Sequence, residues 1–228
     1  MSSVRLRPRV AFQGQPGAFS EDAAIKLLGD DIELVPRATF GDLFQSIDDK
    51  VADYAVAPIE NSLAGTIQPC RDLLYRSSLV ITGEVIIPIA QQLIAVPGAS
   101  FDNIESVESH PVALAQCEHF FAAHPQLRRV EADDTAGSVA RVLESGDLRR
   151  AAVAGKRAAE LYGGQILKEN IQDDRNNYTR FLLLSSAEFI RQAGRLVLDQ
   201  VDVERKGPEA LRSFFVATNN ANEGGKKE

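Results

Sequence analysis

Apolar residues follow two alternating patterns along this chain. Short, mainly apolar runs, at 10–12, 54–57, 151–154 and 179–184, are typical of buried strands. The stretches between them carry apolar residues every three or four positions, as over 40–47, which predicts amphipathic helices. Strands that alternate with helices indicate an α/β protein.

Capping and stop residues predict where the helices begin and end. Ser20 is expected to cap the first helix, which ends near Gly29. Further helices are expected to begin at Thr39, Pro111, Thr135 and Lys156, and another is expected over 63–74.

The stretch 79–96 differs in composition from the rest of the chain, because it is long, apolar and rich in Ile and Val. Pro88 and Gln91-Gln92 interrupt it, and we interpret it as strands that cross from one lobe into another. We expect one domain over 9–185, with lobe 1 about 9–87 plus 172–185 and lobe 2 about 88–171. A short extension over 186–228 is expected to follow, with a disordered end.

Composition narrows the range of partners and compartments. The chain has 228 residues and a net charge of −7, which disfavours binding to nucleic acid. It has no run of 18 apolar residues and no secretory signal, so we expect no membrane partner. Its two cysteines form no CxxC pair, and we therefore expect a cytoplasmic protein.

The sequence predicts neither a metal nor a cofactor. The histidines His110, His119 and His124 lack the spacing of a zinc site. Neither a complete dinucleotide fingerprint nor a phosphate-binding loop is present in the sequence. Any chemistry is therefore expected to use ordinary side chains.

Polar clusters lie where predicted strands run into predicted helices, at 14–20, 58–66, 109–117 and 133–136. Helix N-termini bind anions through free backbone N–H groups, so several of them around one cleft would suit a small dianion. The alternative is that the serines and threonines in these clusters only cap their helices. A fifth segment, 177–181, sets a threonine beside an arginine at the start of an apolar strand, where the two could also be purely structural.

In order and spacing, these five segments resemble the signature set of the prephenate dehydratase family, and the resemblance covers residues 9–185. It implies two α/β lobes joined by crossing strands, as in type II periplasmic binding proteins, with the active site in the inter-lobe cleft. It also implies decarboxylating dehydration of prephenate to phenylpyruvate, carbon dioxide and water in L-phenylalanine biosynthesis, without a cofactor. Arogenate dehydratase and a non-catalytic ligand-binding module of the same fold are the alternatives.

The resemblance also implies which residues form the site. Thr179, Glu60 and Asn61 would be catalytic, with Glu60, if buried, as the proton donor and Thr179 as a hydrogen-bond donor to the leaving hydroxyl. The substrate would be bound by Ser20, Ser62, Gly65, Ser109, Gln116, Thr135, Arg180 and Phe181. Helix N-termini near Ser62 and Thr135 would anchor its side-chain carboxylate.

Assembly and regulation are also implied by the resemblance. A homodimer or homotetramer that binds a small-molecule substrate is expected. Family members usually carry an ACT domain, a phenylalanine-binding module that needs about 70 to 80 residues. Only 43 residues follow Ser185, so we expect no complete ACT domain, one strand or short helix over 195–203, and no phenylalanine inhibition through such a site.

Overall fold

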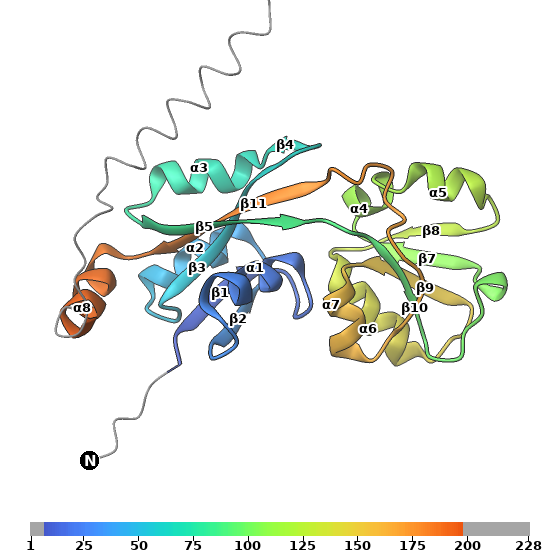
Figure 1. Ribbon diagram of the computed structural model, residues 1–228, viewed down its shortest axis with the longest axis horizontal. Helices are drawn as coiled ribbons and strands as arrows, with labels where there is room; N and C mark the ends of the chain where they lie inside the picture. Colours follow the sequence, from blue (N-terminus) through green and yellow to red (C-terminus); the bar gives the residue numbers. More distant parts are fainter. Residues whose placement is uncertain (1–6, 198–228) are drawn as a thin grey trace, which may run out of the picture. The chain divides into compact units, whose positions relative to one another are not determined.

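The computed structural model describes residues 7–197. The described residues up to Phe189 form one compact unit. This unit contains two sheets, each with helices on both faces, which we call lobe 1 and lobe 2 (Figure 1). The expected fold class, two α/β lobes joined by crossing strands, is confirmed.

Lobe 1 contains a sheet in the order β2-β1-β3-β11-β5, with β4 paired to β3. Its strands are β1 (Arg9–Gln13), β2 (Glu33–Arg37), β3 (Tyr54–Asn61), β4 (Gly65–Thr66), β5 (Val80–Pro88) and β11 (Tyr178–Ser185). Its helices are α1 (Phe19–Leu28), α2 (Phe40–Asp48) and α3 (Gln68–Arg76). Strand β11 returns from the far end of the domain and runs antiparallel to both of its neighbours.

Lobe 2 repeats this arrangement, with its sheet in the order β10-β6-β9-β7-β8. Its strands are β6 (Gln92–Ala95), β7 (Ser106–Ser109), β8 (Arg128–Glu131), β9 (Arg150–Ala154) and β10 (Gln165–Lys168). Its helices are η1 (Phe101–Asn103), α4 (Pro111–Ala115), α5 (Glu118–Ala123), α6 (Thr135–Ser145) and α7 (Lys156–Tyr162). Strand β6 is antiparallel to its neighbours, as β11 is in lobe 1. Two segments therefore cross between the lobes, one from β5 to β6 and one from β10 to β11 (Figure 1).

Each central strand is buried on both faces, because helices cover both sides of its sheet. In β1, Val10 and Phe12 pack with α1, whereas Ala11 between them packs with α2 and α3 on the other side. Successive side chains of a strand point to opposite faces, so an unbroken apolar run buries both. This explains why the short apolar runs of the sequence mark the central strands.

Several predicted element boundaries need correction. Helix α1 begins at Phe19 with Ala18 in the capping position, so Ser20 lies inside its first turn. The helix expected over 63–74 begins only at Gln68. The Asn61 side chain accepts hydrogen bonds from the N–H groups of Leu63 and Ala64 at 3.0 and 2.9 Å, which holds this segment in a turn instead.

Besides the two-residue β4, two strands at sheet edges were not expected from the sequence. Strand β2 contains Pro36, which lacks an N–H group, but β2 lies at the edge of its sheet, where a proline is tolerated. Strand β10 lies at the edge of the lobe 2 sheet and is only partly buried. Edge strands carry too few buried residues to stand out in the sequence pattern.

A helix, α8 (Ala187–Val197), follows β11 and leads into a second unit, which begins at Ile190. It includes the first residues of the segment 195–203, for which a strand or short helix was expected. The remainder of that segment, the expected disordered end and any remnant of an ACT domain lie outside the described residues.

Helices α1 and α7 bring the two lobes into direct contact beside the cleft. The buried Glu21 carboxylate accepts hydrogen bonds from the Gly17 N–H group and the Arg157 guanidinium, each at 2.7 Å. Tyr162 of lobe 2 donates to the Pro16 carbonyl oxygen at 2.9 Å. Gly17 has a φ of +90°, and a Cβ atom there would lie 2.9 Å from the Ala158 Cα atom. The contact therefore requires a residue without a side chain at position 17.

Gly17→Ala should lower the free energy of unfolding by about 2 to 4 kcal/mol, because it combines left-handed backbone strain with a clash against α7. Gly29→Ala is the matched control: its φ is +79°, but no atom lies within 4 Å of a Cβ atom built there. The control should cost only about 1 kcal/mol. Urea unfolding of both variants measures the difference, and equal losses would contradict the close packing of Gly17 against Ala158.

Asp22 should make the domain less stable as the pH rises. Burial raises the pKa of this carboxyl to about 6, against a partial opposing effect of Arg157. The folded protein therefore holds the proton more tightly than the unfolded chain, and ionisation between the usual carboxyl pKa and about 6 favours unfolding.

Asp22→Asn cannot ionise at this position, so its stability relative to the native protein should increase from pH 4 to pH 7. Because the carboxyl is partly exposed, the gain should be about 1 kcal/mol or less. Thermal unfolding across this pH range measures it. Asp102→Asn, which makes the same substitution at an exposed position, is the matched control.

Candidate functional site

A cleft of about 430 Å³ lies between the lobes. Three other hollows among the described residues are smaller, at about 270 to 310 Å³, and one of them shares Ile89 with the cleft. Lobe 1 contributes side chains from α1, β3 and β11 to the cleft, and lobe 2 contributes side chains from α4 and the start of α6. The lining includes Gln13, Ser20, Phe40, Asn61, Gln91, His110, Gln116, Asp133, Asp134, Thr135, Thr179 and Phe181.

The pairing of β3 with β11 decides which predicted residues reach the cleft. Thr179 is opposite Asn61, and Arg180 is opposite Glu60. Because side chains alternate along a strand, the first pair and the second pair point to opposite faces. Asn61 and Thr179 line the cleft, each 7% exposed. Glu60 and Arg180 form an ion pair away from the lining, with 3.2 Å between Nη2 and Oε2.

A chain of polar side chains connects lobe 1 to lobe 2 along one wall of the cleft. The Asn61 Nδ2 group lies 3.0 Å from the Thr179 hydroxyl and 2.8 Å from the Asn177 Oδ1 atom. The Asn177 Nδ2 group donates to the Gln116 Oε1 atom at 3.1 Å. Gln91 donates to the same oxygen at 3.3 Å. The chain fixes the orientation of each amide, because each donor has a defined acceptor.

The two ends of this chain keep hydrogen-bonding capacity. At one end, Thr179 accepts from Asn61, and no described residue accepts the proton of its hydroxyl. At the other end, Gln91 is 2% exposed, and its Oε1 atom has no partner among the described residues. A buried acceptor without a donor costs about 1 to 3 kcal/mol, so this atom marks a place where a ligand could complete the network.

The structure brings together at the cleft six of the residues expected from the sequence: Ser20, Asn61, Gln116, Thr135, Thr179 and Phe181. Two more lie close by but outside the lining. The Ser62 hydroxyl donates to the Asn176 carbonyl oxygen at 2.7 Å and accepts from the Tyr178 N–H group at 2.9 Å. Gly65 lies in β4 with a φ of +77°. Both residues shape the turn after β3.

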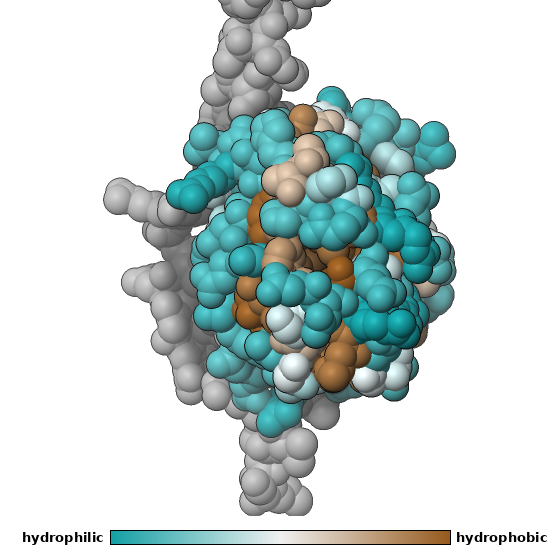
Figure 2. Space-filling view, turned by 90° about the vertical axis from the view of Figure 1, so that its right-hand side faces the viewer, coloured by the Kyte–Doolittle hydropathy of each residue, from teal (hydrophilic) through white to brown (hydrophobic). Residues whose placement is uncertain are grey.

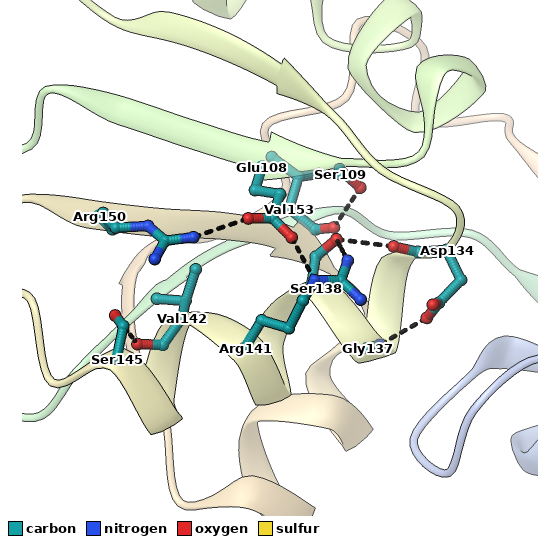
Figure 3. Close-up of polar contacts among 10 residues, drawn as sticks. All are labelled: Glu108, Ser109, Asp134, Gly137, Ser138, Arg141, Val142, Ser145, Arg150 and Val153. Atoms are coloured by element: carbon teal, nitrogen blue, oxygen red, sulfur yellow. Dashed lines mark hydrogen bonds and ion pairs between the residues drawn. The ribbon is translucent and has the colours of Figure 1, made fainter.

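Three further residues expected at the site lie away from the cleft. Ser109 is fully buried, and its hydroxyl donates to the Val153 carbonyl oxygen at 2.6 Å, so it joins β7 to β9 (Figure 3). The other two are Glu60 and Arg180. The Glu60 side chain is 53% exposed, so the burial on which its role as proton donor depended is not present.

Gln91, Asn177 and Asp133 were not among the predicted site residues, although Asn177 and Asp133 lie in two of the polar segments. The sequence held one signal for Gln91, because paired glutamines interrupt an otherwise apolar stretch. Asn177 is 1% exposed, a burial that becomes evident only when the second crossing segment is placed beside β3. Asp133 is exposed at the cleft, directly before the residue that caps α6.

The lining carries acidic groups but few basic ones. Among the described residues that form it there is no lysine or arginine. His110 is the one basic side chain, and its Nδ1 atom accepts from the Val112 N–H group at 3.2 Å. Asp134 caps α6 by accepting a hydrogen bond from the Gly137 N–H group (Figure 3). Asp133 has no hydrogen bond or ion pair with a described residue.

Other kinds of site find little support in the part of the chain that we describe. It contains no cluster of three or more acidic, histidine or cysteine side chains that could hold a metal ion. Burial raises the pKa of both cysteines to about 12, so neither thiol is an activated nucleophile. No described helix could span a membrane. The face turned to the viewer in Figure 2 is mostly hydrophilic, with smaller apolar areas among the polar ones.

Known sequences agree with the signature segments. The family model "Prephenate dehydratase" matches residues 10–188. "Arogenate dehydratase/prephenate dehydratase 1, chloroplastic" from Arabidopsis thaliana is 44% identical over 187 residues, which are 82% of this chain and 47% of that protein. The chain thus spans about half the length of the curated relatives that it matches.

Two solved structures are similar over most of the described residues. Prephenate dehydratase from Arthrobacter aurescens, in complex with L-Phe, has a TM-score of 0.72 and 30% identity, covering 78% of this chain and 60% of its own. GqqA, described as a novel type of quorum quenching acylase, also has a TM-score of 0.72, with 32% identity, and covers 88% of this chain and 67% of its own. Both share the fold described above.

The expectation of a cytoplasmic protein is contradicted by these relatives. Several of them from Arabidopsis thaliana, at 43% to 45% identity, are described as chloroplastic. The expectation relied on the two cysteines, which are free and buried. Buried thiols persist wherever thiols are kept reduced, so they do not distinguish one reducing compartment from another.

Asn61→Ala should lower the free energy of unfolding by about 1 to 3 kcal/mol, because it leaves Asn177 and the turn after β3 without their partner. Asn103→Ala, an exposed residue in η1, is the control and should change it by less than about 0.5 kcal/mol. Urea unfolding compares the two. Similar losses would show that the Asn61 network does not stabilise the fold.

Proposed function

Because the chain belongs to the prephenate dehydratase family, we propose that it catalyses the decarboxylating dehydration of prephenate or of its amino counterpart, L-arogenate. The products are phenylpyruvate or L-phenylalanine, respectively, with carbon dioxide and water. The observation that carries this proposal is the Thr179 hydroxyl, which lies in the cleft wall and is oriented by Asn61 at 3.0 Å.

The reaction requires that the enzyme position the substrate and donate a hydrogen bond to its leaving hydroxyl group. The bond between the ring and its carboxylate breaks, and that electron pair forms a new double bond in the ring. The C–O bond on the opposite ring carbon breaks at the same time, and the departing hydroxide takes up a proton to become water. The ring becomes aromatic, which drives the reaction. No electrons are gained or lost overall, so no redox partner is required.

We assign to Thr179 a hydrogen bond to the departing hydroxyl. The Asn61 amide donates to the Thr179 oxygen, which leaves the threonine proton available for a ligand. Negative charge develops on the leaving oxygen, so a hydrogen bond from a donor already in place strengthens in the transition state. Asn61 then acts as a positioning residue, held in turn by Asn177 and by the turn after β3.

The carboxylate that leaves must not be held by a strong ion pair, because that would stabilise the bound substrate more than the transition state. Arg180 is paired with Glu60 on the other face of the strands, which keeps its charge away from the cleft. Phe181 lines the cleft and is 2% exposed. We propose that it forms the apolar wall beside the departing carboxylate.

The carboxylate on the substrate side chain remains through the reaction and can be anchored. The first turns of α1 and α6 contribute Ser20 and Thr135 to the cleft. Free N–H groups and the helix dipole favour an anion at these ends. Ser62 was expected to mark a third such end, but it precedes a turn and not a helix. We therefore assign the anchor to the starts of α1 and α6.

Assembly and location are further proposals. A homodimer or homotetramer remains our expectation for the assembled enzyme, and sedimentation of the purified chain would measure it. The chloroplastic relatives make the chloroplast our proposed compartment. No partner other than the small-molecule substrate is proposed.

Thr179→Val should lower turnover about 10²- to 10³-fold without unfolding the protein, because it removes one oriented donor and keeps the shape of the side chain. Thr179→Ser restores the hydroxyl and should recover most of the activity. Release of phenylpyruvate from prephenate and of phenylalanine from arogenate measures both variants. A valine variant with native turnover would refute the role of the hydroxyl. A native protein that binds both compounds and converts neither would be a ligand-binding module of this fold.

A further inference from the structure

We propose that Asp133 makes this cleft select the amine-bearing substrate, L-arogenate, over the keto acid prephenate. The inference rests on the proposed function and adds a residue that determines specificity. The two compounds share the ring, its hydroxyl and two carboxylates. They differ at one atom of the side chain, where arogenate carries an ammonium group and prephenate a keto oxygen. The cleft must therefore discriminate a cationic donor from a neutral acceptor.

The charge of the cleft favours the ligand with fewer uncompensated negative charges. Prephenate carries two negative charges, whereas the ammonium group of arogenate balances one of its two carboxylates. No lysine or arginine is among the described residues that line the cleft, although two aspartates are. Moving a dianion next to carboxylates and away from water, without a cation to pair with it, is unfavourable. An ammonium group removes part of that cost.

Of the two aspartates, Asp133 is the one available to a ligand. Asp134 uses its carboxylate to cap α6 through the Gly137 N–H group, as Figure 3 shows. The Asp133 carboxylate makes no hydrogen bond or ion pair with a described residue, and it is exposed where it lines the cleft. A carboxylate accepts strong, charge-assisted hydrogen bonds from an ammonium group, whereas a keto oxygen has no proton to donate to it.

A second observation also indicates a ligand rich in donors. Gln91 belongs to the cleft lining, and its Oε1 atom is buried and has no donor among the described residues. Gln91 already donates its own N–H group to Gln116, so its unused capacity is that of an acceptor. Thr179 and Gln91 lie at opposite ends of the polar chain, and the hydroxyl and side chain of arogenate lie at opposite ends of its ring. With Thr179 at the hydroxyl, lobe 2 receives the side chain, and the Asp133 carboxylate and the Gln91 amide oxygen there are acceptors without a donor among the described residues.

The test measures kcat/KM for both substrates with the full chain, following phenylalanine and phenylpyruvate separately. The native protein should prefer arogenate. Asp133→Asn should lower kcat/KM for arogenate about tenfold and raise that for prephenate about threefold. Asp133→Lys should shift the ratio further and favour prephenate. Asp102→Asn removes one negative charge from the exposed surface of the same lobe and should leave the ratio within twofold of the native value.

The outcomes separate this inference from the proposed function. A native preference for prephenate, or an Asp133→Asn variant that changes both substrates alike, would overturn the inference and leave the dehydratase function standing. If Asp102→Asn also abolished the preference in kcat/KM for arogenate over prephenate, the net charge of the protein, and not Asp133, would determine that preference. A chain that converts neither substrate would refute the proposed function itself. A ratio that changes only with Asp133 supports the assignment.

Discussion

The antiparallel register between β3 and β11 is the constraint on which the site depends. It sets Thr179 opposite Asn61, although 118 positions separate them in sequence. The same register sets Glu60 opposite Arg180. A slip of one residue in β11 would turn Arg180 toward the cleft face and Thr179 away from it, since side chains of a strand alternate between its faces. The charge of Arg180 would then enter the cleft, and the oriented hydroxyl would be lost.

The repeated order of strands explains why the cleft lies where it does. In each lobe, one strand that adjoins a crossing segment, β11 in lobe 1 and β6 in lobe 2, lies inside the sheet and runs antiparallel to both neighbours. The crossing segments bring Gln91 and Asn177 to the boundary between the lobes, and hydrogen bonds through Gln116 join them. On another side, Glu21 of α1 contacts Arg157 of α7. The cleft is thus bordered by contacts that belong to both lobes.

Much of this architecture could be predicted from the sequence. Unbroken apolar runs in the sequence predict the central strands, because helices cover each of these strands on both faces. Thr39 and Pro111 begin helices as expected, since the Thr39 side chain caps α2 and a proline suits the first turn of α4. The signature segments also indicated six of the residues that line the cleft.

The rest of the site depends on tertiary contacts, which leave no pattern in the neighbouring sequence. Ser109 sits in a signature segment, yet its hydroxyl is used between two strands. The direction of Glu60 follows from strand register, which the sequence does not specify. Asn177 and Gln91 lie on segments distant in the chain, and both form hydrogen bonds to Gln116 only after these segments meet in the folded protein. Polar residues of this kind are common in turns and at the surface, so the neighbouring sequence does not indicate that these are buried.

The position of β11 also bears on the order in which the chain can fold during synthesis. Strand β11 lies between β3 and β5, inside the sheet of lobe 1, and not at its edge. Lobe 1 therefore cannot complete its sheet until the ribosome has released residues 178–185, after the whole of lobe 2. Lobe 2 needs only β6 to β10 and can close first, although it is encoded second. Until then β3 and β5 have unpaired edges, and these edges are open to non-native strand pairing while lobe 2 is being synthesised.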